Sequence, residues 1–229
     1  MIEEPPLLQI RRGFARPDAA VLARFANVQT EHLVDAMDGR GALDYGVKAL
    51  DPARATFVGS AVTCQCGPGD NLAIGAALSL IQPGDVIVAA TDAFSGVAVV
   101  GRRIAGMAKN RGAVAIVTDG LVRDAPGVRA TGLPVFCRGV TPNSAYATGP
   151  GTVGQPAVIG GVTVQSGDIV VGDGDGVVVV PRRRIDEVLI RLEAVRAREA
   201  DLAAKLAAGL GVPRRVTELL ASPQVRYLD

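Results

Sequence analysis

The sequence predicts an α/β fold in which helices cover a parallel or mixed sheet. Between residues 67 and 139, segments with helical apolar spacing alternate with short β-branched runs. This alternation is typical of a sheet covered by helices. Between residues 152 and 180 the helix signals vanish, and valine-rich runs alternate with Gly-Asp turns, which indicates short antiparallel strands or a second small sheet. A long amphipathic helix is then predicted over residues 182–208.

The length and composition predict one domain without an internal linker. The chain has 229 residues, of which 48% are hydrophobic, so it can bury a sizeable core. Aromatic residues make up only 3% and tryptophan is absent, so valine, alanine, leucine and isoleucine must build that core. We expect a single domain over residues 1–229, with an N-terminal arm at 1–16 and a C-terminal tail at 210–229.

Two helices and one strand are expected before the alternating region. Residues 17–28 begin at a proline and show helical apolar spacing. Residues 30–41 are predicted to form a second short helix, which Thr30 caps and a glycine ends. Residues 55–66 are rich in β-branched side chains and predict a strand.

The alternating region itself should contain both helices and strands. One helix is expected over residues 94–112, because five apolar side chains share a face at helical spacing: Val97, Val100, Ile104, Met107 and Ala108. The other expected elements are a glycine loop opening a helix at 67–81, strands at 86–90 and 113–117, a helix or turn at 122–132, and a strand at 133–139.

The C-terminal part contains a hairpin candidate and the long helix. The loop GDGDG (172–176) carries Asp173 and Asp175 but lacks the later ligands and the closing glutamate of an EF-hand. An Asp-Gly hairpin turn is therefore favoured over a calcium loop. The long helix should end at Gly209. Its charges alternate in sign, which is also typical of a merely solvated outer face.

The charge balance and the cysteines argue against several classes of protein. The formal net charge is +1, without the basic stripe expected of a nucleic-acid binder. The best candidate for a membrane span, residues 72–90, is interrupted by a Gln-Pro-Gly-Asp turn. The N-terminus is acidic and broken by prolines, unlike a signal peptide. Three cysteines argue against a disulfide scaffold and predict a cytoplasmic protein with reduced thiols.

Cys64 and Cys66 are expected to be small apolar residues on a strand. Their C-x-C spacing has no second pair to complete a closed zinc site, and His32 is the only histidine. Free cysteine behaves as a small hydrophobe when it is buried.

The segment GPGDNLA (67–73) is a candidate ligand loop. Glycines let a backbone approach a ligand closely, and Asp70 or Asn71 can cap the helix that follows. The first N–H groups of that helix could then bind an anion. Neither a Gly-Lys-Ser/Thr sequence nor a G-x-G-x-x-G pattern is present. Taken by itself, the segment is more often a plain helix cap.

Arg123 and Asp124 stand side by side in TDGLVRD (118–124), directly after the buried run AVAIV. A guanidinium can bind a carboxylate in a fork, and a single carboxylate can contribute to a Mg²⁺ site that keeps several waters. The two side chains would address one ligand only if the loop turns both the same way. The alternative, which the stretch alone favours, is a helix-start pair with Asp124 as the cap.

A series of motifs in a fixed order resembles one known family. The motifs are GDNLA, PGDVIV, TDGLVRD, LPVFCRG, GGVTVQSGD and GDGDGVVVVP, followed by a Glu-rich helix. Together they resemble the 4-hydroxy-4-methyl-2-oxoglutarate aldolase family of class II pyruvate aldolases, which shares its fold with the regulator of ribonuclease activity A (RraA). The resemblance covers roughly residues 30–208. It implies an α/β/β/α sandwich of the swivelling phosphohistidine-domain type, with mixed sheets, flanking helices and a long C-terminal helix.

The resemblance also implies an assembly and a metal site. Members form homotrimers, often hexamers that are dimers of trimers, and the aldolase site lies between subunits. Carried over, Asp124 would coordinate a divalent metal, Mg²⁺ or Mn²⁺. Arg123 would bind the carboxylate or keto oxygen of a pyruvate moiety.

Two further groups would complete the site that the resemblance implies. Backbone N–H groups in the ligand loop would hold the same anion, namely those of Gly69, Asp70, Asn71 and Leu72. A glutamate from the long helix of a neighbouring subunit would approach the site. Glu199 fits that role best, with Glu193 as the reserve.

The implied activity is that of a metal-dependent carbon–carbon lyase. Cleaving a 4-hydroxy-2-oxo acid, or removing CO₂ from oxaloacetate, leaves pyruvate as an enolate, whose charge a metal and an arginine stabilise. We therefore expect an aldolase or oxaloacetate decarboxylase for a small 2-oxo acid, with Arg123, Asp124 and Glu199 as catalytic residues. The alternative is a non-catalytic RraA-like protein that binds and regulates a ribonuclease. Neither reading requires direct contact with nucleic acid or a membrane.

One residue departs from the family pattern. In the aldolases an acid commonly follows a glycine upstream of the Arg-Asp pair and orients a metal-bound water. Here Gly101 is followed by Arg102. The expected helix would turn Arg102 towards solvent, and a cation beside Mg²⁺ would oppose the metal electrostatically. Asp92 is the candidate substitute for the missing acid.

Overall fold

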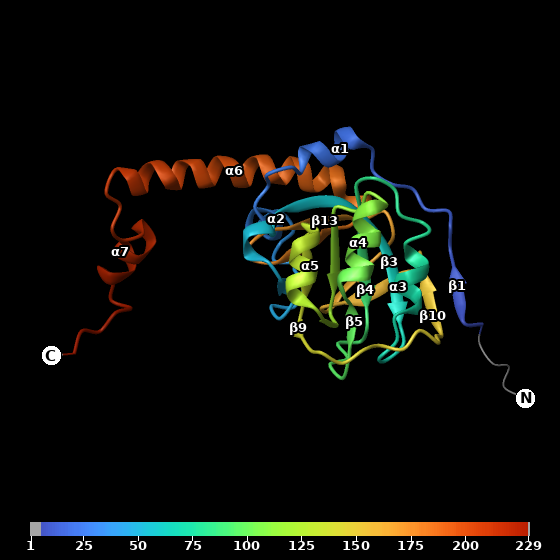
Figure 1. Cartoon of the computed structure of the whole chain (residues 1–229). Coiled ribbons are helices and arrows are strands. Elements are labelled where there is room, and N and C mark those ends of the chain that lie inside the picture. The colour runs from blue at the N-terminus through green and yellow to red at the C-terminus, as the bar shows by residue number, and fades with distance from the viewer. Residues whose placement is uncertain (1–5, 229) are drawn as a thin grey trace, which may run out of the picture.

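The structure, a computed structural model, describes residues 6–228 and is built around a nine-stranded mixed sheet (Figure 1). Its strands are β1 Leu8–Ile10, β2 Lys48–Ala49, β3 Phe57–Cys66, β4 Asp85–Ala90, β6 Ala115–Thr118, β8 Val135–Cys137, β10 Gly151–Val153, β13 Ile169–Gly172 and β14 Val177–Val180. They follow the order β1-β10-β3-β4-β6-β8-β2, and the β13–β14 hairpin joins through β3. Strands β3, β4, β6 and β8 pair in parallel, which confirms the predicted α/β fold.

Three helices connect these parallel strands, as the alternating pattern predicted. Helix α3 (Leu72–Ala77) lies between β3 and β4, α4 (Arg102–Asn110) between β4 and β6, and α5 (Ala125–Thr131) between β6 and β8. The three helices lie on the same side of the sheet (Figure 1). Mixed sheets with flanking helices are therefore confirmed. The finer assignment to the swivelling phosphohistidine-domain type stays a prediction.

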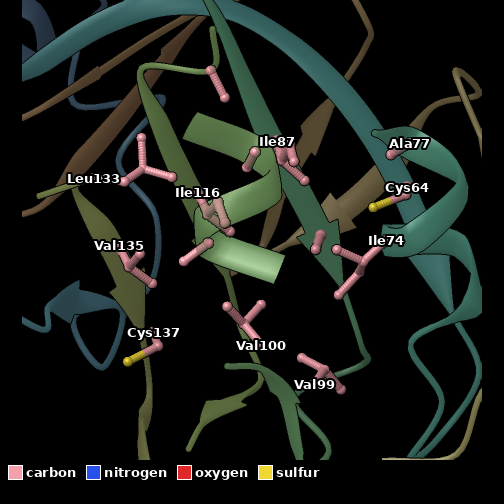
Figure 2. Packing of buried hydrophobic residues seen from close by; sticks show 14 of the residues in the cluster. Cys64, Ile74, Ala77, Ile87, Val99, Val100, Ile116, Leu133, Val135 and Cys137 are labelled. Atoms are coloured by element: carbon pink, nitrogen blue, oxygen red, sulfur yellow. The ribbon is translucent and has the colours of Figure 1, made fainter. Parts of the chain in front are cut away.

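The core between these helices and the sheet is aliphatic, as the composition required. Figure 2 shows Ile74 of α3, Ile87 of β4 and Ile116 of β6 within one buried cluster. All three cysteines are free thiols and are buried on strands, so Cys64 and Cys66 are the small apolar residues that were expected. A second cluster, on the far side of β13 and β14, receives side chains from α2 (Thr30–Ala36) and α6 (Ile185–Ala207).

A small parallel sheet corrects the predicted helix at 94–112. Residues 98–100 form β5 (Ala98–Val100), which pairs in parallel with β7 (Leu121–Val122), and β7 pairs with β9 (Gly139–Val140). Only the second half of the expected helix is helical, beginning at Arg102 after the N-cap Gly101. The physical reason is that β-branched valines before Gly101 prefer a strand, where they pack into the core.

The valine-rich region forms antiparallel strands, as predicted. Strands β11 (Ala157–Ile159) and β12 (Val162–Val164) make a two-stranded hairpin. The pairing of β13 with β14 confirms the predicted Asp-Gly hairpin turn at 172–176. In that turn Asp173 accepts hydrogen bonds from the N–H and the hydroxyl of Thr30, both at 2.8 Å. Thr30 is thus the first residue of α2, after the N-cap Gln29, which corrects its predicted role as the cap.

The chain ends outside the body of the domain. The long helix α6 begins after a 3-10 turn at Arg182–Arg184 and ends at Ala207, with Ala208 as its C-cap directly before Gly209, close to the predicted end. Its buried side chains all lie between residues 188 and 195, and residues 196–207 are exposed. The far part of α6 and helix α7 (Arg214–Leu220) extend away from the sheets (Figure 1). Within residues 6–228, no helix combines the length and apolar composition needed to cross a membrane.

The N-terminal arm is held to the domain at two points. Strand β1 pairs in parallel with β10 at the edge of the sheet. Farther along, the guanidinium of Arg16 binds the buried carboxylate of Asp85, with Nε 2.8 Å from Oδ1. Helix α1 (Ala19–Arg24) follows, within the predicted range, and Asp18 caps it by accepting from the N–H of Val21. Residues 1–5 and 229 of the predicted arm and tail lie outside the described residues.

Candidate functional site

The site forms where two neighbouring parallel strands end. Strands β5 and β7 pair with Val100 opposite Val122, and the N–H of Arg123 donates to the carbonyl of Val100 at 3.0 Å. Parallel strands have their carboxyl ends at the same edge, which is where α/β proteins place ligands. The residues that follow β5 and β7, Arg102 and Asp124, are therefore brought side by side.

Asp124 is both the cap of α5 and a site residue. Its backbone φ is +54°, in the left-handed region that a non-glycine residue rarely adopts, and its Oδ1 accepts from the N–H of Gly127 at 3.2 Å. A Cβ at position 127 would lie 2.7 Å from Cγ of Asp124, so only glycine leaves room for the carboxylate. The helix-cap reading of Asp124 is thus correct, and it fixes where the carboxylate lies.

Arg123 is held by contacts at both ends of its side chain. A Cβ at Gly101 would come within 3.2 Å of Arg123 Cγ, so the stem of the arginine packs directly on the glycine. At the other end, Nη1 donates a hydrogen bond to the hydroxyl of Ser144. A guanidinium oriented in this way needs little further ordering to bind an anion.

Arg102 is largely exposed to solvent, as expected, but it also lies at the site, beside Asp124. Its Nε is 3.3 Å from Oδ2 of Asp124, and the two side chains are 68% and 48% exposed. This unexpected contact has a simple origin. Because α4 begins at Arg102 and not at residue 94, the side chain occupies the first turn of the helix, beside the end of β7.

A cavity of about 940 Å³ collects these residues. Its lining is mostly apolar and comes from α3, β5, the start of α4 and the loop after β9. The charged side chains among the described lining residues are Arg102, Arg103, Arg123 and Asp124. Asp124 is therefore the single carboxylate that the described part of this chain contributes to the cavity.

The predicted ligand loop borders the cavity through Asn71 and Leu72. Its N–H groups already have acceptors: that of Asp70 donates to Gly67, that of Asn71 to Tyr146, and that of Leu72 to Oδ1 of Asp70. An anion would have to compete with these bonds. The predicted capping role belongs to Asp70, because Asn71 occupies the N-cap position without a side-chain cap bond. Gly69 is not among the residues that line the cavity.

Asp70 ties the loop after β9 to the start of α3. Its Oδ2 accepts from the N–H groups of Thr148 and Gly149 at 2.6 and 2.9 Å. Burial acts to raise the pKa of Asp70, but hydrogen bonds donated by Leu72, Thr148 and Gly149 outweigh it and hold the pKa below its usual value. The carboxylate is thus a structural anion that shapes one wall of the cavity.

The remaining predicted acids lie away from this cavity. Glu193 and Glu199 are exposed residues of α6, and neither lines the cavity. Asp92, the candidate substitute acid, accepts a hydrogen bond from Nε2 of Gln65 and borders other hollows of the surface. The structure therefore brings together Arg123, Asp124, Asn71 and Leu72, and places Glu199 outside the cavity.

A divalent metal does not fit the residues that one chain provides. The described residues contain no group of three or more His, Cys, Asp or Glu side chains placed to hold a metal ion. Both oxygens of Asp124 are engaged, one by the N–H of Gly127 and the other by the guanidinium of Arg102. A cation at that carboxylate would meet the charge of Arg102 at close range.

The fold and the Arg-Asp pair at the strand ends define an α/β protein of the RraA type. The family model described as Aldolase/RraA (RraA-like) matches residues 30–179, and the chain belongs to this family.

Three relatives illustrate the family. The chain is 37% identical, over 77% of its length and 83% of the relative's, to a protein of Halalkalibacterium halodurans named "Putative 4-hydroxy-4-methyl-2-oxoglutarate aldolase". A crystal structure of an uncharacterized protein from Pseudomonas syringae superposes with a TM-score of 0.75 at 30% identity, covering 86% of this chain and 96% of the other. The crystal structure of Streptomyces coelicolor RraAS2, described as an unusual member of the RNase ES inhibitor RraA protein family, superposes with a TM-score of 0.73 at 30% identity. The match covers 84% of this chain and 100% of the other. Lyase and regulator names thus both occur among the relatives.

Sequence reasoning singled out Arg102 as a departure from the family pattern but not its contact with Asp124, and it missed Ser144. The signal for Arg102 was present, because the β-branched run ending in Val100 and the following glycine together mark a strand that passes into a helix. Ser144 gave no local signal. It reaches Arg123 because the loop after β9 folds back over the strand ends, where Ser144 bridges to Ala98.

Proposed function

We propose that this protein is a carbon–carbon lyase that acts on a small 2-oxo acid through a pyruvate enolate. The reaction would be the cleavage of a 4-hydroxy-2-oxo acid, the decarboxylation of oxaloacetate, or both. The observation that carries the proposal is the orientation of Arg123, held between Gly101 and Ser144 at the edge of a largely apolar cavity. The family membership and the aldolase name of one relative support it.

The cavity supplies what enolate formation needs most. The bond that breaks is attached to the carbon next to the keto group, and its electrons leave negative charge on the keto oxygen. This charge develops in the transition state, so a fixed guanidinium stabilises the transition state more than the substrate. Losing one such oriented donor typically costs about 10²–10³-fold in rate.

The divalent metal has no step in this proposal. The resemblance implies Mg²⁺ or Mn²⁺ at Asp124, but this chain presents one carboxylate that is already engaged. The role proposed for Asp124 is to orient Arg102 and to fix the start of α5. Whether metal is required is tested separately from whether the bond is cleaved.

A second copy of the chain is proposed to complete the site. Glu199 stands in a stripe at helical spacing on α6, between the buried Leu192 and Val195 and the exposed Leu202 and Leu206. A surface that covers the exposed leucines therefore also covers Glu199. The homotrimer or hexamer expected from the resemblance would supply such a surface and bring Glu199 to a neighbouring cavity.

The proposal is tested by measuring pyruvate release from purified protein. The substrates are oxaloacetate and a panel of 4-hydroxy-2-oxo acids, each with added Mg²⁺, with Mn²⁺ and with EDTA. We expect release from at least one of them, and a loss of about 10²-fold or more in Arg123→Ala. Arg24→Ala, which removes an exposed arginine at the end of α1, is the matched control and should keep full activity. Activity that is equal in wild type and Arg123→Ala would refute the assigned site.

The alternative function is the binding and regulation of a ribonuclease. Two observations favour it: the match to Streptomyces coelicolor RraAS2, and the presence of Arg102 beside Asp124. This reading predicts no pyruvate from any substrate in the panel, together with direct binding of a purified RNase E-type enzyme measured by calorimetry. Arg123→Ala should leave that binding unchanged if a docking surface, and not the cavity, makes the contact.

A further inference from the structure

We infer that Arg102 takes the place of a divalent cation in this cavity, which therefore binds a small dicarboxylate without metal. The inference rests on the proposed function in that it concerns the same site, and it specifies the class of substrate and the source of positive charge. Its central feature is the position of the Arg102 guanidinium, with Nε 3.3 Å from Oδ2 of Asp124.

Both carboxylate oxygens of Asp124 already have partners. The N–H of Gly127 engages Oδ1, and the first turn of α4 places the Arg102 guanidinium against Oδ2. An ion at Oδ2 would have to displace Arg102, and it would then stand within a few ångströms of a like charge. The described lining residues offer no second carboxylate to compensate. The Arg102 guanidinium thus already supplies positive charge at the carboxylate to which a metal would bind.

The charge of the cavity indicates the charge of its ligand. The described lining of the cavity carries three arginines, Arg102, Arg103 and Arg123, and one carboxylate, Asp124, which gives a formal charge of +2. All other lining side chains are uncharged. Electrostatic complementarity to such a surface favours a ligand with two negative charges.

Arg102 can reach a ligand because its ion pair with Asp124 is exposed to solvent. An ion pair between side chains that are 68% and 48% exposed is weak and exchanges readily with another anion. A carboxylate that enters the cavity can therefore share or replace Asp124 as the partner of Arg102. Arginine forms two parallel hydrogen bonds to a carboxylate, so Arg123 and Arg102 can each hold one end of a dicarboxylate.

Binding of malonate, measured by isothermal titration calorimetry in EDTA, tests the inference without turnover. We expect malonate to bind with a 1:1 stoichiometry per chain, and acetate to bind at least about 10-fold more weakly because it lacks the second charge. Arg102→Ala should weaken malonate binding by about 10- to 100-fold, as expected for the loss of a charge-assisted pair. Arg24→Ala is the control for net charge and should bind like wild type.

A second variant tests the relation between Arg102 and metal directly. Arg102→Asp places a second carboxylate near Asp124 and should create a Mn²⁺ site, detected by electron paramagnetic resonance as loss of the free-ion signal. Wild type should leave that signal unchanged. Circular dichroism of each variant establishes that it is folded, and exposed Arg102 can be replaced without opening the core.

The possible results separate this inference from the proposed function. Malonate binding that requires Mg²⁺, or that is unchanged in Arg102→Ala, would overturn the inference even if pyruvate is released. Tight Mn²⁺ binding by wild type would overturn it as well. Malonate binding that needs Arg102 but no metal would support the inference, even if none of the 2-oxo acids is cleaved. In that case only the proposed function is refuted.

Discussion

Oδ2 of Asp70 accepts a hydrogen bond from the N–H of Thr148 at 2.6 Å. This bond joins the start of α3 to the loop after β9, which lines the cavity. The same oxygen accepts from the N–H of Gly149 and the hydroxyl of Thr148, while Oδ1 accepts from Leu72. One buried carboxylate therefore joins two segments beside the cavity that are far apart in sequence.

Replacing Asp70 with asparagine should destabilise the protein. The amide cannot accept at both oxygen positions, so at least one buried N–H loses its partner, at about 1–3 kcal/mol in the free energy of unfolding. Urea unfolding at pH 7 measures the change. Asp175→Asn, in the exposed loop of the β13–β14 hairpin, is the control and should stay within about 0.5 kcal/mol of wild type.

The stabilisation by Asp70 should depend on pH in a defined direction. Burial acts to raise its folded pKa, but the bonds from Leu72, Thr148 and Gly149 outweigh burial and lower it, whereas an unfolded aspartate has a pKa of about 3.9. The contribution is therefore complete above about pH 4 and is lost as pH falls through the lower folded pKa. The gap in unfolding free energy between wild type and Asp70→Asn should narrow below about pH 4. A gap that does not narrow there would contradict this assignment.

The ion pair of Arg16 with Asp85 should be a main anchor of the N-terminal arm. The Asp85 side chain is 1% exposed and accepts from Nε and Nη2 of Arg16 at 2.8 and 2.9 Å. Arg16→Ala would leave a buried carboxylate without its partner, at a cost of about 3–5 kcal/mol in unfolding free energy. Thermal and urea unfolding measure this cost. Arg214→Ala breaks the exposed pair with Glu218 and should change stability by less than about 1 kcal/mol.

Gly127 should be essential for the position of Asp124. A Cβ at residue 127 would overlap the Asp124 carboxylate, so Gly127→Ala must displace it from the start of α5. We expect loss of the cap, about 1 kcal/mol of stability, and weaker malonate binding measured by calorimetry. Gly106→Ala is a matched control, since a Cβ there meets open space within α4 and should stabilise the helix slightly. Similar effects of the two substitutions would contradict the proposed crowding.

Local patterns predict the sheet, the hairpin and the Arg-Asp pair because each depends on neighbours in sequence. Arg123 and Asp124 come soon after the strand predicted at 113–117, so a place near a strand end can be read from the chain. The short strand β7, which directly precedes Arg123, was not predicted. The pairing of Arg102 with Asp124 cannot be predicted from the sequence, because it depends on the parallel register of β5 with β7. Valines at 97 and 100 fit a helical face and a strand equally well in a short run, and tertiary pairing decides between them.

The exposed part of α6 should mediate self-association. Leu202 and Leu206 are 42% and 57% exposed and continue the buried stripe of Leu192 and Val195. Leu202→Glu with Leu206→Glu should therefore shift the protein from an oligomer towards monomer in light scattering coupled to size exclusion. Ala204→Glu, on the opposite face of the same helix, should leave the mass unchanged.

The same assembly should make activity depend on Glu199. Because Glu199 lies within the stripe, covering the leucines places it against the neighbouring chain. Glu199→Gln should keep the oligomeric mass and lower pyruvate release, whereas the double leucine variant should lower both. A decisive measurement is made on a mixture of Glu199→Gln chains and Arg123→Ala chains. A shared site in this mixture regains activity only when one chain supplies Arg123 and another supplies Glu199. No recovery in exchanged mixtures would place Glu199 outside the reaction.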